Sequence, residues 1–308
     1  RFACQTPADT CMTATDCTGG YCNSDDVRTC QTPTITGTGG SCGRPFLVAG
    51  HARLAAVRSV EGGWSRRSGL DATGLSERAR RTLAKYWTEA GRMEHASVAA
   101  FARFALELLA LGAPAELVVG AQQAMGDEIE HARLCFGLAA GYAETPVGPA
   151  ALSIDGALDA RSFEAIVTTA MLEACVGETL AAIEAEEALA DAREPEVRRA
   201  LERIARDEAK HAELGFRFLG WALKRAAPEL RARLVAELGG ALRTLFEEPA
   251  ELAQSDETEL AGHGLLSNSR RRALRRLAIR QIIEPALAGL SGSAPERCSP
   301  GWFRSEIS

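Results

Sequence analysis

The sequence has no continuous apolar run as long as the roughly 18–20 residues that a helix needs to cross a bilayer, so we expect no membrane span. It also has no excess of positive charge. The net charge is −6, with 35 Lys and Arg against 41 Asp and Glu, which argues against a protein that coats nucleic acid. A glycine-rich phosphate loop and a serine-nucleophile elbow are absent as well. The amino-acid composition is that of an ordinary globular protein, with 46% hydrophobic and 25% charged residues among 308.

Histidine and the CxxC spacing are both missing from residues 1–42, which disfavours a zinc module there. This segment nevertheless holds six of the nine cysteines, namely Cys4, Cys11, Cys17, Cys22, Cys30 and Cys42. With few large apolar residues it cannot fold on a hydrophobic core, so we predict a small disulfide-stapled module whose pairing stays open. Disulfides indicate an oxidising compartment, and the chain begins at Arg1 rather than Met. We therefore expect an exported protein (periplasmic, cell-surface or secreted) whose signal segment has been removed.

Beyond the cysteines, residues 43–75 are expected to form a linker with a short hairpin that turns at Gly50. From Ser76, a plausible N-cap, the chain becomes helical. We expect helices at about 76–111, 114–142, 160–190, 195–227, 228–247 and 269–290. The first four are joined by a short, a long and a short connection. This order predicts an all-α fold with a ferritin-like four-helix bundle over residues 76–224, followed by a helical C-terminal extension and tail over 225–308.

Two copies of one motif stand inside these helices: "DEIEHARL" at 127–134 and "DEAKHAEL" at 207–214. Heptad spacing puts Glu128 and His131 on the buried side of the second helix, and Glu208 and His211 on that of the fourth. A glutamate and a histidine three residues apart share one helix face, about 5–6 Å from each other, so they can bind one metal together. Glu94 falls on the buried side of the first helix in the same way.

The third helix offers two glutamates, Glu173 and Glu178, in "LEACVGETLAAI". Glu94 precedes Glu128 by almost as many residues as Glu173 precedes Glu208, which favours Glu173 as the counterpart of Glu94. Glu178 lies as far from its loop as Glu208 does. We keep it as a further ligand or a near neighbour of the site.

Each buried carboxylate needs a partner, because burying an uncompensated one costs several kcal/mol. Salt bridges to arginine would be one explanation, but the buried sides of these helices lack Arg and Lys at neighbouring core positions. Two divalent metal ions would balance four carboxylates, with two neutral imidazoles completing the set. Ligation by carboxylate and imidazole suits iron or manganese.

One Glu, then Glu-x-x-His, then one Glu, then Glu-x-x-His over four helices resembles the ferritin-like di-iron carboxylate superfamily, which includes rubrerythrins and di-iron oxygenases. The resemblance covers about residues 76–224. It implies as metal ligands Glu94, Glu128, His131, Glu173 or Glu178, Glu208 and His211. It also implies that Asp127 and Asp207 hydrogen-bond the free ring nitrogen of the opposite histidine. The cysteine-rich N-terminal segment, the C-terminal extension and the lack of a rubredoxin-type Cys₄ site depart from the rubrerythrin pattern.

For function, the resemblance implies two iron ions (or manganese) with O₂ as co-substrate. Our first hypothesis is an oxidase or monooxygenase that acts on a small organic molecule or a peptide, with a separate protein as electron donor. The second is a ferroxidase, peroxide-scavenging or iron-binding protein, and the third is a metal-stabilised structural or surface-binding module. The C-terminal extension favours the first, because a minimal ferroxidase needs only the four helices.

Overall fold

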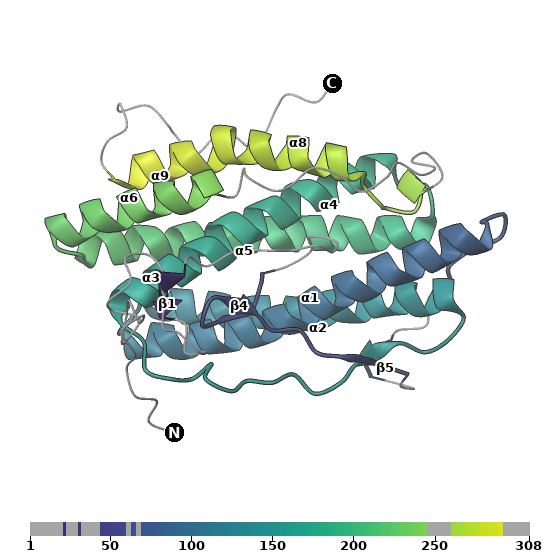
Figure 1. Cartoon of the computed structure of the whole chain (residues 1–308), viewed down its shortest axis with the longest axis horizontal. Coiled ribbons are helices and arrows are strands. Elements are labelled where there is room, and N and C mark those ends of the chain that lie inside the picture. Colours follow the sequence, from purple (N-terminus) through teal and green to yellow (C-terminus); the bar gives the residue numbers. More distant parts are fainter. Residues whose placement is uncertain are drawn as a thin grey trace.

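The computed structural model describes residues 21–22, 30–31, 44–59, 63–65, 69–244 and 260–291. This part of the chain is mostly helical (Figure 1). The predicted disulfide module lies outside it, apart from β1 (Tyr21–Cys22) and β2 (Cys30–Gln31), which pair antiparallel with Cys22 opposite Cys30. The disulfides, and the export that they imply, stay predictions.

The first pair of long helices is α1 (Glu77–Ala110) and α2 (Ala115–Ala143). α1 begins after Ser76, whose hydroxyl accepts a hydrogen bond from the Ala79 backbone amide at 3.1 Å and so satisfies one of the free N–H groups of the first turn. It ends at a turn in which Gly112 adopts a φ of 64°. Because the loop is so short, the two helices run antiparallel and pack along their length.

The second pair consists of a three-part helical rod and α5 (Pro195–Arg225). The rod runs through α3 (Phe163–Ala170), the π-helical η2 (Met171–Glu178) and α4 (Thr179–Asp191). Wide π-turns inside α-helices are rare and are frequent at functional sites. α5 begins with Pro195 at its first position, and the Glu194 carboxylate accepts from the Val197 amide at 2.7 Å.

The connection from α2 to α3 runs back along the molecule and is tied to the segment before α1. β6 (Gly148–Pro149) in this connection pairs antiparallel with β5 (Val57–Arg58). A second hairpin joins β3 (Leu47–Val48) to β4 (His51–Ala52). Its turn consists of Ala49 and Gly50, both with positive φ, which suits the two-residue turns of β-hairpins.

Residues 44–48, which we call the strap, include the first strand of the hairpin that was predicted to turn at Gly50, but they are buried and do not form a linker. Arg44, Phe46, Leu47 and Val48 are all buried. Phe46 and Val48 pack with Ala96 and Ala100 of α1, because three adjacent apolar side chains here find small residues on the helix surface beneath them. The strap therefore belongs to the folded core, and composition alone misled us about it.

The C-terminal extension forms a layer over α4 and α5, on the side away from α1 and α2 (Figure 1). Its elements are α6 (Pro228–Thr244), α8 (Asn268–Ala278), η3 (Ile279–Ile283) and α9 (Glu284–Ser291). Three ion pairs attach α8 to α4: Arg270 pairs with Glu187, and the buried Glu184 lies 3.0 Å from Arg271 Nε and 2.9 Å from Arg275 Nε. Part of the basic charge of α8 is thus used inside the fold.

The helical stretch Phe163–Asp191 is long and apolar enough, by length and composition, to cross a membrane. In its most apolar window 67% is buried inside the protein, as in the central helix of many folded domains. This is the one such stretch within the described residues.

Two apolar clusters fill the space between the long helices, one toward each end. One contains Phe101, Phe104 and Phe218, and the other contains Leu83, Trp87, Tyr142, Leu201 and Ile204. Glu94, Glu128, His131, Glu178, Glu208 and His211 fall between these clusters along their helices, whereas Glu173 lies among residues of the first cluster. The centre of the helical core is therefore polar, and both ends of the core are apolar.

Candidate metal centre

Six acidic and histidine side chains meet at this polar centre. They are Glu94 of α1, Glu128 and His131 of α2, Glu178 at the end of η2, and Glu208 and His211 of α5, all at most 3% exposed. They form two groups that could each hold a metal ion, and within each group the ligand atoms lie within 4.8 Å of one another. Glu128 and Glu208 belong to both groups, so two ions bound here would share them.

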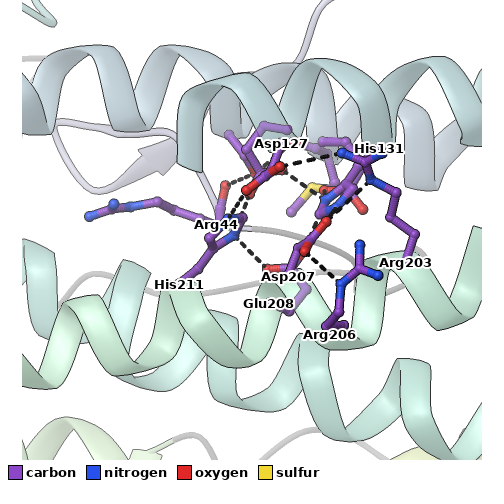
Figure 2. Close-up of polar contacts among 12 residues, drawn as sticks. Arg44, Asp127, His131, Arg203, Arg206, Asp207, Glu208 and His211 are labelled. Carbon is purple, nitrogen blue, oxygen red and sulfur yellow. Dashed lines mark hydrogen bonds and ion pairs between the residues drawn. The ribbon is translucent and has the colours of Figure 1, made fainter. Parts of the chain in front are cut away.

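The histidines are turned so that one ring nitrogen faces the carboxylates and the other faces an aspartate. His131 Nδ1 lies 3.5 Å from Glu208 Oε1, while its Nε2 lies 3.4 Å from Asp207 Oδ2. His211 Nδ1 lies 3.1 Å from Glu128 Oε1. Figure 2 shows that each histidine comes from one helix and its facing aspartate from the other.

The two aspartates are held by basic side chains at the outer edge of the centre. Asp207 Oδ1 accepts from Lys210 Nζ at 2.9 Å and from Arg206 Nε at 3.2 Å. Asp127 Oδ2 lies 3.6 Å from His211 Nε2, and its other oxygen accepts from Arg203 at 3.4 Å (Figure 2). Aspartates in these places fix the ring orientation of each histidine and keep its proton on Nε2, which leaves Nδ1 free to bind a metal.

The net effect of burial and of the cluster's charges is a raised pKa for two of its glutamates and for its histidines. Burial raises the pKa of Glu94 well above its usual range, and the charges of Glu128 and Glu208 raise it further. Burial and Glu208 do the same to the pKa of Glu178. For His131, burial lowers the pKa, but the nearby carboxylates of Asp207, Glu128 and Glu208 outweigh it and leave the pKa well above its ordinary value. In the absence of a metal ion, the raised pKa values favour the protonated forms of Glu94, Glu178 and His131.

Several oxygen atoms of the cluster are buried without a hydrogen-bond partner. Both carboxylate oxygens of Glu94, Glu128 and Glu178 and one of Glu208 are in this state. Within the described residues, no Lys or Arg forms an ion pair with these four glutamates. Four buried carboxylates without Lys or Arg partners fit the ligand set of two divalent cations, because the carboxylates would balance the charge of the ions and two neutral imidazoles would complete the set.

Glu173, the glutamate that the sequence favoured on the third helix, does not lie in this cluster. Its Oε1 accepts from Arg103 Nη2 at 2.6 Å and from the Leu47 amide at 3.0 Å, and its Oε2 accepts from Arg44 Nε at 3.3 Å. Arginine therefore compensates the buried carboxylate of Glu173. From the sequence, salt bridges to arginine had been set aside for every predicted ligand. Glu178 takes the place in the cluster that had been expected of Glu173.

The geometry of an antiparallel hairpin explains the difference. Residues at equal distance from the connecting loop lie at the same level, and Glu178 precedes the loop by as many residues as Glu208 follows it. Glu173 lies five residues further along, about 7 Å away along the helix axis. The number of residues between the two ligands of a hairpin was misleading. It includes the helical residues between each ligand and the loop, and their number differs between the two hairpins.

Arg44 and Arg103 are the two buried residues of this region that the sequence did not single out. Arg44 was assigned to a linker. Arg103 could have been noticed, since it is the one basic residue in the mostly apolar stretch "FARFALELL" next to the buried face of the first helix. Its buried position required a carboxylate partner, and Glu173 was available.

Comparison of the chain with models of known protein families, with curated proteins and with solved structures gave no significant match. The likeness to ferritin-like proteins thus depends on the motif pattern and on the geometry of the cluster. Both describe a helical protein with a buried Glu/His cluster that is able to bind a metal.

Proposed function

We propose that the chain is a ferritin-like di-metal protein, an oxidase or monooxygenase that uses two iron ions, or manganese, and O₂ to oxidise an organic or peptide substrate. One observation carries this proposal: the two ligand groups overlap in Glu128 and Glu208, and each adds one glutamate and one histidine of its own. Paired ions held in this way are the arrangement that di-iron carboxylate bundles use. In this reading the two helical hairpins form the four-helix bundle.

Each residue then has a defined task. Glu128 and Glu208 would bridge the two ions, while Glu94 with His131 and Glu178 with His211 would complete one ion each. Asp127 and Asp207 keep the histidine protons on Nε2. Two ferrous ions at such a centre supply electrons to O₂. The apolar clusters on both sides keep water away from the centre.

The second candidate is a ferroxidase or peroxide-scavenging protein. It is favoured by the complete burial of the ligands, because only a metal ion and a very small molecule would need to reach them. The layer formed by α6, α8 and α9 favours the first candidate, since a ferroxidase centre needs nothing beyond the helices that carry the ligands.

The two candidates differ in how O₂ consumption depends on iron. The chain is reconstituted with Fe²⁺ under anaerobic conditions, its metal content is determined, and O₂ uptake is followed with and without an external reductant. An oxidase or oxygenase should hold two ions per chain and consume O₂ repeatedly while reductant lasts. Uptake that stops in proportion to added Fe²⁺ would support the ferroxidase instead, and less than one ion per chain would refute both.

A further inference from the structure

Arg44 is a fully buried cation whose two outer nitrogens have no partner. Its Nε donates to Glu173 Oε2 at 3.3 Å, but Nη1 and Nη2 are buried and make no hydrogen bond in the described part of the chain. Buried donors without acceptors are rare in folded proteins, and on a charged group they are especially costly. The hydrogen-bonding capacity of this guanidinium group is therefore not satisfied within the described part of the chain.

Glu173 does not satisfy the hydrogen-bond donors of Arg44 on its own, because it is shared. Its other oxygen accepts from Arg103 at 2.6 Å and from the Leu47 amide at 3.0 Å. Arg103 also has Glu107, whose Oε1 lies 3.8 Å from its Nε, so Arg44 lacks hydrogen-bond acceptors rather than a counter-charge. The rings of Phe101 and Phe104 face the Arg44 Cζ atom with their centroids 4.5 and 4.7 Å away, but such cation–π contacts offset only part of the cost of burying a cation.

Arg44 and the candidate metal centre contact the same phenyl ring, although the guanidinium end of Arg44 points away from the labelled cluster side chains in Figure 2. The same Phe101 ring contacts His211 edge-on, with the ring centroids 5.1 Å apart, so a single phenyl ring separates the guanidinium group from a candidate ligand. Burial raises the pKa of the Cys175 thiol, the charge of Arg44 opposes that rise and the charge of Glu178 adds to it. Cys175 therefore lies close to both Arg44 and Glu178. Figure 2 shows that the main-chain end of Arg44 is beside the same cluster.

We propose that Nη1 and Nη2 of Arg44 bind a carboxylate of the substrate, in a subsite beside Phe101, Phe104 and Cys175. This inference rests on the proposed function and narrows its substrate to organic acids. The two free nitrogens form a planar fork that matches the two oxygens of a carboxylate, and those oxygens supply the acceptors that Nη1 and Nη2 lack. The neighbouring aromatic rings provide an apolar surface for the rest of the molecule. The acid is either a free small molecule or the C-terminus of a peptide, since both present the same group.

The test measures the preference of the protein for an acid over its uncharged amide. The full chain is loaded with Mn²⁺, and benzoate and benzamide are titrated by calorimetry. An acetylated dipeptide with a free or an amidated C-terminus forms a second arm that separates the two sources of the carboxylate. At least one acid should bind about tenfold or more tightly than its amide, the factor expected for hydrogen bonds to a charged group. Arg44→Met should lower this ratio to about one.

Arg92→Met is the matched control, because Arg92 also contacts the segment before α1, donating to the Ala55 carbonyl at 2.8 Å, but does so at the half-exposed edge of the fold. It should keep the full preference. If Arg44→Met fails to fold by circular dichroism, Arg44→Gln replaces it with the same expectation. A wild-type ratio near one overturns the subsite, and so does a preference that survives the loss of Arg44, because manganese itself would then be the binding group.

Failure of this inference differs from failure of the proposed function. The metal content of the same samples is measured before each titration. A chain that takes up two Mn²⁺ ions but shows no preference for acids refutes the subsite alone. A chain that takes up no metal yet loses its preference with Arg44→Met refutes the metal centre and supports the subsite.

Discussion

Two glutamates five residues apart on one helical rod are buried in opposite ways. Glu173 is surrounded by donors: two guanidinium groups and a backbone amide point at it. Both oxygens of Glu178 are buried with no hydrogen-bond donor among the residues that the structure describes, and burial together with the charges of Glu208 and Glu128 raises its pKa despite the opposing effect of His211. Both side chains are at most 1% exposed, so burial does not distinguish them.

This contrast shows which property marks a metal ligand. A buried carboxylate that has enough donors is explained by the fold, whereas one without donors needs a cation from outside the chain. The unpartnered oxygens of Glu94, Glu128 and Glu178 are therefore stronger evidence for a metal than the Glu-x-x-His spacing by itself. The following experiments test the contrast, starting with the largest expected effect.

Glu208→Gln should abolish metal binding at both positions, because Glu208 belongs to both ligand groups. Elemental analysis after anaerobic reconstitution with Fe²⁺ should find less than one ion per chain. Glu202→Gln, on the exposed face of the same helix, should leave the metal content unchanged. If Glu208→Gln kept two ions per chain, the shared-ligand arrangement would be wrong.

Glu173→Gln and Glu178→Gln should have reciprocal effects. Glu173→Gln leaves the buried Arg44 without a counter-charge and Arg103 with Glu107 alone, so it should lower the free energy of unfolding by about 3–5 kcal/mol while both metal ions stay bound. Glu178→Gln should lose metal but leave the metal-free protein at least as stable as the wild type. Urea unfolding and metal analysis on both variants decide the matter. Loss of metal in Glu173→Gln alone would restore the assignment made from the motif spacing.

Asp207→Asn should weaken metal binding by about 10- to 100-fold, because the amide can present its NH₂ group to His131 Nε2 and no longer fixes the proton there. Asp127→Asn should have a smaller effect, since Asp127 is 29% exposed and lies 3.6 Å from its histidine. Competition with a fluorescent chelator gives both affinities. Equal affinities in the wild type and both variants would show that the aspartates serve only the ion pairs at the surface.

The metal-free protein should lose stability as the pH rises above about 4.5. The folded-state pKa values of Glu94 and Glu178 are raised above 4.5, and those of His131 and His211 above 6.5, so the folded state binds more protons than the unfolded state at higher pH. Each extra proton costs about 1.4 kcal/mol of stability per pH unit. The lowered pKa values of Asp207 and Glu208 act only below that range.

Urea unfolding at several pH values between about 5 and 8, with and without Mn²⁺, measures this slope. Bound metal replaces the protons, so the decline should largely disappear in the loaded protein. Glu94→Gln should flatten the decline in the metal-free protein. A metal-free protein whose stability is constant over this range would show that the cluster is already neutralised in some other way.

Much of the helical layout could be predicted from the sequence, because periodicity and caps are local signals. Ser76 caps α1 and the loop at 192–194 separates α4 from α5, as the pattern indicated. The positions of Glu128, His131, Glu208 and His211 followed from three-residue spacing on one face, which no tertiary detail can change.

The remaining features depend on contacts between distant parts of the chain. Arg44 and Glu173 are 129 residues apart, and no local pattern connects them. The choice between Glu173 and Glu178 differs from this case, because the sequence already placed Glu178 as far from its loop as Glu208, but the spacing between motifs was preferred. The π-helical turn of η2 also changes which residues face the centre, and nothing in "MLEACVGE" distinguishes it from an ordinary helical turn.

Gly215 has a consequence for which ions the centre can accept. A Cβ atom there would lie 2.7 Å from the Ala174 Cβ and 3.1 Å from the η2 backbone, so the two helices touch one turn away from His211 and Glu178. The gap between the opposing ligands is thus fixed by contact between main chains rather than by long, adjustable side chains. Ionic radius becomes a selection criterion in such a centre, because an ion that is too large cannot spread the ligands without parting the helices.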